Sequence, residues 1–177
     1  MKASPNSLLD RLRKSTREQH DSLESVTLGE KIMDGSLSLP EYHRLVEWQQ
    51  RTHQRLEPLV AAFQYGDYTY RPRFPLHELP SGEDSPAMAR MLGILYVLEG
   101  SSLGGSIIYR KLQENPNLTT EGRFDFYRQQ SEWGLKQWRS LVSVLNSVTL
   151  TEEEMELATQ SARDTFDRFT AEWAALA

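Results

Sequence analysis

Residues 92–105 read LGILYVLEGSSLGG, an apolar helical run that passes directly into Gly100, Gly104 and Gly105. A glycine inside a helix costs about 1 kcal/mol relative to alanine, so three of them cost on the order of 3 kcal/mol. Typical domains are stabilised by only about 5–15 kcal/mol, so the fold must offset this loss. Gly100 and Gly104 share one helix face, which lets the backbone approach either a flat ligand or another helix. We expect a kinked helix over residues 86–113 and leave both alternatives open.

The chain on either side of this run also has helical periodicity, with no convincing alternating pattern of a strand. Further helices are expected over residues 7–25, 28–34, 38–63, 121–146 and 151–173. Ser38 and Glu41 have the spacing of a capping box, and Gly35 is placed to end the short helix before them. Residues 65–85 contain three prolines and are expected to form a long connection. The predicted fold is an all-α, single-domain, multi-helix bundle over residues 1–177.

Composition excludes several classes of function. The chain has 177 residues, a formal net charge of −5 and no cysteine. The negative charge argues against nucleic acid as the main partner, because binding phosphates needs a basic surface. Without cysteine there is no disulfide framework, thiolate metal site or cysteine nucleophile. Residues 1–7 lack the apolar stretch of a signal peptide, and the most apolar segment, residues 88–98, is shorter than a membrane span. We therefore expect a cytoplasmic protein that does not enter membranes.

The first predicted helix carries a histidine among leucines. At about 100° per residue, His20 lies on the same stripe as Leu9 and Leu12 and points toward the interior. An imidazole that faces a cavity can ligate iron if an acceptor holds its other ring nitrogen, and Glu24 is one turn away. A histidine of this kind is also commonly a core residue, and this helix alone does not distinguish the two readings.

Two segments together resemble haem oxygenases. LRKSTREQHDSLES (Leu12 to Ser25) is similar to the motif of the helix that carries the haem ligand, and YVLEGSSLGG (Tyr96 to Gly105) to the opposing helix of bacterial members. The motifs lie about 80 residues apart, in the order of the family. The resemblance implies a haem held between the first helix and the kinked, glycine-rich helix.

The resemblance also implies roles for single residues. His20 matches the iron ligand and Glu24 its orienting partner. Arg13 and Tyr96 match residues that bind a haem propionate, and Arg17 lies where some members have another cation. The resemblance assigns Gly100, Ser101, Gly104 and Gly105 to the wall opposite the histidine. Lys136 or Arg139 matches a second cationic anchor, and Phe166 matches an aromatic residue that lines the pocket on the side opposite the histidine. Animal members have an aspartate where this chain has Ser101, so we expect ordered water near Ser101 or Ser102 to carry protons.

The activity implied by the resemblance is oxidative cleavage of haem at a meso carbon to biliverdin, with release of ferrous iron and carbon monoxide. Haem is then both substrate and cofactor, and dioxygen is the second substrate. The chain has no glycine-rich nucleotide fingerprint, so a separate reductase or ferredoxin must supply the electrons. We expect a bacterial monomer, with a phytochrome as one acceptor of the biliverdin.

Three other classes of protein share some of these features. A di-iron carboxylate bundle needs glutamate three residues before a histidine, but those positions before His20, His43, His53 and His77 are Arg, Pro, Gln and Phe. Thiaminase-like proteins share the fold and use a cysteine that is absent here. A haem carrier or sensor without turnover stays open, because its ligand and pocket would look the same. His53, at the edge of its apolar stripe, is predicted to be structural.

Overall fold

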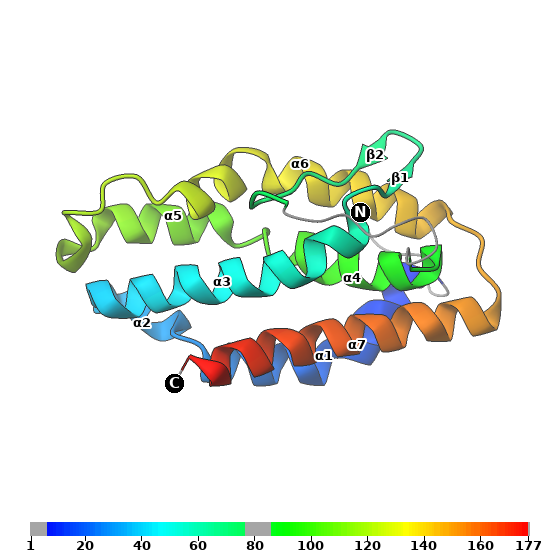
Figure 1. Ribbon diagram of the computed structural model, residues 1–177, viewed down its shortest axis with the longest axis horizontal. Helices are drawn as coiled ribbons and strands as arrows, with labels where there is room; N and C mark the ends of the chain where they lie inside the picture. The colour runs from blue at the N-terminus through cyan, green and yellow to red at the C-terminus, as the bar shows by residue number, and fades with distance from the viewer. Residues whose placement is uncertain (1–6, 77–85, 177) are drawn as a thin grey trace.

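The computed structural model describes residues 7–76 and 86–176, and its helices follow the expected order (Figure 1). The helices are α1 (Leu8–Val26), α2 (Gly29–Asp34), α3 (Leu39–Val60), α4 (Met88–Gly100), α5 (Gly105–Glu114), α6 (Asp125–Ser147) and α7 (Glu152–Ala175), with a short 3-10 helix, η1 (Pro116–Leu118). The strands β1 (Gln64–Tyr65) and β2 (Tyr68–Thr69) pair antiparallel, with Gln64 opposite Thr69. The prediction of an all-α fold is confirmed.

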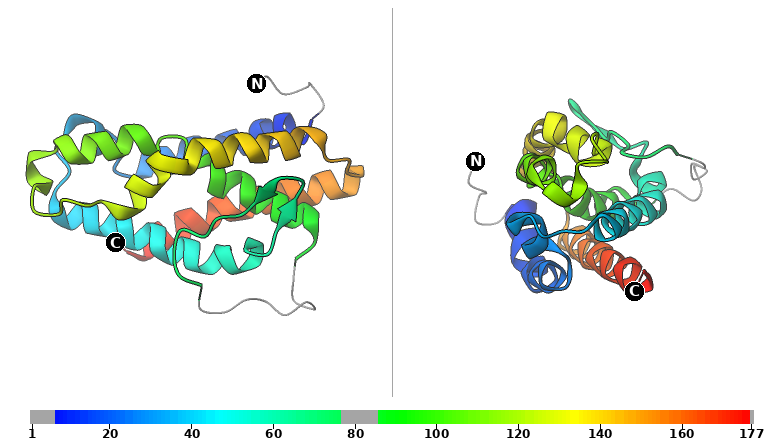
Figure 2. Two further views of the ribbon diagram at one scale, coloured as in Figure 1. Left: turned by 90° about the horizontal axis from the view of Figure 1, so that it is seen from above. Right: turned by 90° about the vertical axis from the view of Figure 1, so that its left-hand side faces the viewer.

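Helix α4 is the central element of the bundle. It packs against α7, α6 and α3, and the end-on view in Figure 2 shows the longer helices arranged around it. Leu92, Leu95 and Leu98 are fully buried on it. At Gly93 the backbone of α4 crosses α7 so closely that an added Cβ would lie 2.2 Å from the carbonyl oxygen of Ala158. The absence of a side chain at Gly93 therefore fixes the distance between these two helices.

The first and last helices lie side by side. α1 packs on α7 along much of its length, and the two run together along the lower edge of the molecule in Figure 1. Leu9 and Leu12 on α1 are completely buried, and Phe169 on α7 is nearly so. The apolar stripe predicted for the first helix is thus the surface that faces the bundle.

The local signals at the helix ends have the structures expected of them. At α3, the Ser38 hydroxyl accepts from the Glu41 amide and the Glu41 carboxylate accepts from the Ser38 amide, at 3.4 and 2.9 Å. Hydrogen bonds from the Lys31 ammonium and the Ser38 amide lower the pKa of the Glu41 carboxylate to about 2. Gly35, with φ of +78°, ends α2. Thr151 caps α7, where glutamates fill the first turn as predicted.

Several boundaries differ from prediction; α3, for example, ends at Val60 instead of at residue 63. The helix expected over 86–113 is divided, because a turn at residues 101–104 separates α4 from α5. α6 begins at Asp125 rather than at 121, because Gly122 and Phe124 have φ of +68° and +48°, which no α-helix continues. The connection expected over 65–85 contains the hairpin at its start. Its residues 77–85, including His77, lie outside the described residues.

One stretch, Met88–Glu114, is long and apolar enough to cross a membrane by length and composition alone, when α4 and α5 are counted together. This stretch is longer than residues 88–98, the segment that was expected to be too short for a membrane span. Half of its most apolar window is buried within the bundle. Within this stretch α4 is the more deeply buried helix and lies at the centre of the bundle.

Candidate functional site

A cavity of about 540 Å³ lies between α1 on one side and the turn that joins α4 to α5 on the other. Ligand sites are commonly about 300–1,000 Å³, so the cavity has the size of a small-molecule site. Most of its wall is apolar or aromatic, with side chains from α1, α3, α6 and α7 that include Leu23, Leu45, Trp48, Tyr127 and Phe169. A few polar groups enter this wall, and they include most of the residues singled out from the sequence.

His20 lines this cavity from α1. Its side chain is 55% exposed, so the expectation of a buried histidine is wrong: the stripe of buried residues ends at Thr16, and His20 projects into open space. Its Nδ1 lies 3.3 Å from Oδ1 of Asp21. Within the described residues no hydrogen bond reaches Nε2, so this atom is available to a metal ion.

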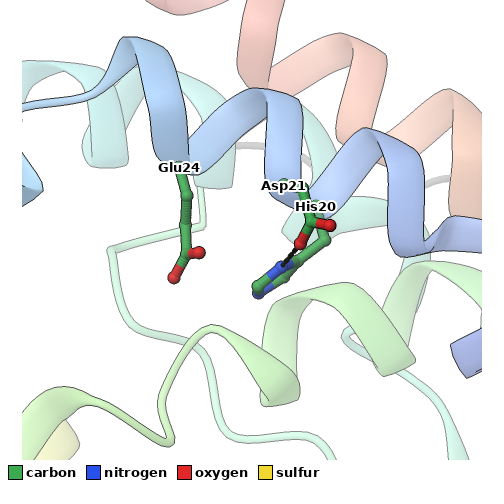
Figure 3. A group of neighbouring side chains, drawn as sticks. All are labelled: His20, Asp21 and Glu24. Atoms are coloured by element: carbon green, nitrogen blue, oxygen red, sulfur yellow. Dashed lines mark hydrogen bonds and ion pairs between the residues drawn. The ribbon is translucent and has the colours of Figure 1, made fainter.

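The carboxylate beside the imidazole is not the expected one. Glu24 was predicted to orient His20, but in the described part of the chain only Asp21 bonds to the ring. Figure 3 shows the Glu24 carboxylate projecting from the next turn of α1 on the same side as the imidazole. Nitrogen and oxygen atoms of all three side chains lie within 4.8 Å of one another. Glu24 lines the cavity, and both carboxylates are near enough to influence the ring.

Phe166, on α7, lies on the same side of the cavity as His20. Its ring meets the imidazole edge-on, with the ring centres 6.2 Å apart. The resemblance implied that Phe166 lines the wall opposite the histidine, whereas the structure places it against the histidine itself. An aromatic ring of α7 therefore packs against the imidazole.

Arg13 and Tyr96 form a polar corner where α1 faces α4, and both line the cavity. Burial raises the pKa of Tyr96 above its ordinary value, opposed by a hydrogen bond with Thr16 and by the charge of Arg13. A guanidinium and a phenol at one corner suit a carboxylate group of a ligand. The structure thus brings these two predicted residues together. Arg17 and Lys136 (and Arg139) are exposed, and none of them is among the cavity-lining residues of the described chain.

The glycine turn, residues 100–104, contributes to the wall opposite His20. An added Cβ at Gly100 would come no closer than 3.6 Å to Trp138, and one at Gly104 no closer than 3.7 Å to Ile108. Both glycines and Ser101 line the cavity. The Ser101 hydroxyl donates to the Leu98 carbonyl at 2.7 Å and retains its acceptor sites for water.

Gly105 has a different role from the one implied. It is buried and is absent from the cavity wall, and an added Cβ would lie 2.8 Å from Cβ of Gln130. Its missing side chain lets α5 pack against α6. Of the two explanations left open for the three glycines, a ligand face applies to Gly100 and Gly104, and helix packing applies to Gly105.

A buried ionic cluster behind the glycine turn was missed from the sequence. Nη2 of Arg73 donates to Oε2 of Glu99 at 2.9 Å and to the Ser102 hydroxyl at 3.2 Å, and the Tyr68 hydroxyl donates to Oε1 of Glu99 at 2.8 Å. The Arg73 and Glu99 side chains are both fully buried. A glutamate inside the apolar run before Gly100 was the available signal.

A second buried carboxylate anchors the connection that carries Arg73. The Glu57 carboxylate accepts from the Arg73 amide at 2.7 Å, the Phe74 amide at 3.2 Å and the Tyr70 hydroxyl at 3.1 Å. Burial raises the pKa of Glu57, and these bonds oppose the rise. The connection after β2 is thereby fixed to α3 and to the residues on either side of Gly100 and Ser101.

His53 is a core residue, as predicted. It is completely buried among Phe74, Phe126 and Phe169, outside the cavity wall, and its Nδ1 lies 2.7 Å from the Gln49 carbonyl oxygen. Burial, aided by the charge of Arg73, lowers the pKa of His53 to about 3, so the ring is neutral.

The cavity combines features that suit one kind of ligand. In the described residues Nε2 of His20 has no hydrogen-bond partner, two glycines leave backbone uncovered in the opposite wall, and a basic and a phenolic group mark one corner. A flat, largely apolar molecule that carries a metal ion and a carboxylate matches this set of groups. Haem is such a molecule, and the residues present fit it.

Comparison with known proteins gives a consistent result. The sequence model of the family described as "Heme oxygenase" matches residues 6–77 and 75–174. The chain is 30% identical over 181 residues to "Heme oxygenase PigA" of Pseudomonas aeruginosa, a match that covers 90% of this chain and 87% of that protein.

Proposed function

The chain belongs to the haem oxygenase family and is a haem-degrading enzyme; from this premise we propose that it cleaves haem at a meso carbon to biliverdin, releasing ferrous iron and carbon monoxide. Haem and dioxygen are the substrates that the family implies. Bound haem supplies the iron at which dioxygen is activated. The residues of the chain bind and orient the ring, exclude bulk water and direct protons.

In this proposal His20 binds the haem iron through Nε2. Support comes from its place in the cavity wall and from the engagement of Nδ1 with Asp21. An acceptor on Nδ1 fixes the ring tautomer and orients the lone pair of Nε2 toward the ligand. Asp21 and Glu24 are both near enough for this task, and Phe166 limits the tilt of the ring from α7. A neutral imidazole also withholds the electron donation by which a thiolate promotes O–O cleavage.

Arg13 and Tyr96 are the proposed anchors for a haem propionate. They lie at one corner of the cavity, and a guanidinium bonds a carboxylate more strongly than a neutral donor does. Arg17 and Lys136 lie outside the wall, so the geometry favours Arg13 and Tyr96 over them.

Gly100 and Gly104 are proposed to place backbone against the opposite face of the haem. Their missing side chains leave a shallow wall that limits the directions in which a small ligand on that face can lie. Ser101 has no acidic proton, so water held by its hydroxyl and by backbone carbonyls delivers protons without a strong acid at the site.

The remaining assignments concern the surroundings of the enzyme. We propose that it works in the cytoplasm of a bacterium, as a monomer, with electrons from a separate reductase or ferredoxin. A phytochrome is one acceptor for the biliverdin. The separate electron donor follows from the chemistry, which consumes electrons although the chain has no glycine-rich nucleotide-binding fingerprint of its own.

The observation that carries the proposal is the pairing of an available histidine nitrogen with a facing backbone wall. The test mixes the purified chain with ferric haem, records the Soret band and then adds a reductant under air. Turnover predicts loss of the Soret band and appearance of the biliverdin spectrum. A haem spectrum that persists under reductant and air would identify a carrier or sensor instead, and no Soret shift at all would refute haem binding.

A further inference from the structure

One turn of α1 presents three potential metal ligands together. His20 and Glu24 are four residues apart and so lie on one face of the helix, with Asp21 beside them. The candidate ligand atoms of the three side chains are within 4.8 Å of one another. Figure 3 shows the imidazole and both carboxylates on the same side of α1. Ligand atoms around one metal ion lie about 3–4 Å apart at bond lengths near 2.0–2.2 Å, so small side-chain rotations suffice.

The charges of this group are not balanced by basic residues. In the described ranges, Asp21 and Glu24 form no ion pair with lysine or arginine. By contrast, Asp10 on the preceding turns of α1 pairs with Lys14 at 2.8 Å. His20 and Asp21 are 55% and 66% exposed, so an ion from solvent can reach both side chains. Within the described residues these two carboxylates have no lysine or arginine partner, and together with the imidazole they favour a cation at this point.

The donor set limits which cation fits. One imidazole nitrogen and two carboxylate oxygens suit borderline divalent ions such as ferrous iron, cobalt, zinc and manganese. The cavity provides room for water molecules to complete the coordination. A helical pair of ligands four residues apart is an established way to hold such an ion.

We propose that in the haem-free chain His20, Asp21 and Glu24 bind a divalent first-row transition ion, and that this ion and haem exclude one another. The exclusion rests on the proposed function, because it requires His20 to be the haem ligand. Ferrous iron is the ion that haem degradation sets free. A bound ion at this position makes the enzyme less able to take up haem when that product accumulates.

The direct test titrates Co²⁺ into the haem-free full-length chain and follows the visible absorption bands of the cobalt. One ion per chain is expected. His20→Ala abolishes these bands, and Asp21→Asn and Glu24→Gln each weaken binding by more than about tenfold. His43→Ala is the matched control, because His43 is 57% exposed and lies 2.7 Å from the Glu121 carboxylate but has no second carboxylate in the set. The control should bind Co²⁺ like the parent chain.

The competition is measured by haem titration at increasing Co²⁺. The apparent affinity for haem is expected to fall as Co²⁺ rises, and His43→Ala should show the same fall. In Glu24→Gln the same relative fall, measured from the haem affinity of that variant without Co²⁺, should require more than about tenfold higher Co²⁺. Co²⁺ binding that survives all three substitutions refutes the site, and binding with no effect on haem refutes the exclusion. The cobalt bands do not depend on haem, so a chain that binds Co²⁺ through the three residues but never shows a Soret band would contradict the proposed function alone.

Discussion

His20 shows how much one side chain depends on its neighbours. It follows a stripe of buried residues that ends at Thr16, and beyond this residue the same face of α1 lines the cavity. Asp21 engages one ring nitrogen, and Phe166 lies against the edge of the ring. The free nitrogen is therefore presented in a defined direction before any ligand arrives, which lowers the ordering entropy of binding.

Replacing His20 with alanine is expected to remove the histidine-ligated spectrum of the ferric haem complex. Added imidazole should restore it in part, because the cavity created by the substitution admits the free ring. The measurement is a Soret titration with and without imidazole. His43→Ala, which lies outside the cavity wall, should retain the parent spectrum. A spectrum unchanged in His20→Ala would show that another residue binds the iron.

The glycines of α4, α5 and the turn between them have two different roles. Gly93 and Gly105 permit close helix crossings with α7 and α6, whereas Gly100 and Gly104 face the cavity. The buried ionic cluster then connects the glycine turn to the segment after β2 through Arg73. The turn is thus held by packing on one side and by buried charge on the other.

Alanine substitution should distinguish the two kinds of glycine. Gly105→Ala meets Gln130 at 2.8 Å and is expected to destabilise the fold by about 1–3 kcal/mol. Gly100→Ala has space and gains helix propensity of up to about 1 kcal/mol, but places a methyl group in the cavity and should slow haem turnover. Urea unfolding and biliverdin production measure the two effects. Equal loss of stability in both variants would contradict the assignment.

Breaking the Arg73–Glu99 ion pair is expected to lower the free energy of unfolding substantially. Arg73→Met leaves the Glu99 carboxylate buried without its partner, which typically destabilises a protein by about 3–5 kcal/mol. The double variant Arg73→Met/Glu99→Met removes both charges and should recover much of that loss. As a surface control, Arg128→Ala loses ion pairs with Glu132 and Asp125 and should leave the stability close to that of the parent chain. Urea unfolding of the four proteins measures these differences. A double variant less stable than Arg73→Met would contradict the prediction that the unpaired Glu99 charge causes the loss.

Considered as a whole, the molecule has one extensive hydrophobic core in which a histidine is kept neutral. Burial and the charge of Arg73 lower the pKa of His53 to about 3, from 6.5. Between these values the unfolded chain binds a proton that the folded chain refuses, so stability falls as the pH drops through this range. Acid stability is therefore set partly by a residue outside the cavity wall.

His53→Leu should flatten this pH dependence. The loss of unfolding free energy between pH 7 and pH 4 is expected to be smaller than in the parent chain, by on the order of a few kcal/mol. Denaturant unfolding at a series of pH values measures it. Curves that run parallel for the two proteins would show that His53 is not the group responsible.

Much of this organisation is visible in local sequence patterns, and the remainder depends on contacts between distant segments. Helix periodicity and the capping signals at Ser38 and Gly35 act over a few residues, so the all-α fold and several helix ends were predictable. The role of Gly105 could not be read locally, because it depends on where Gln130 of α6 lies. Arg73 lies in an aperiodic connection, and only the folded chain brings it to Glu99.

The pairing of α1 with α7 has a consequence for the synthesis of the protein. α1 ends at Val26 and α7 begins at Glu152, so the two walls that meet at His20 and Phe166 come from opposite ends of the chain. At about 5–20 residues per second, roughly 6–25 s pass on the ribosome between their appearances. During this interval the apolar stripe of α1 lacks α7, its main packing partner. A haem site that uses both His20 and Phe166 can therefore be complete only after α7 has been synthesised.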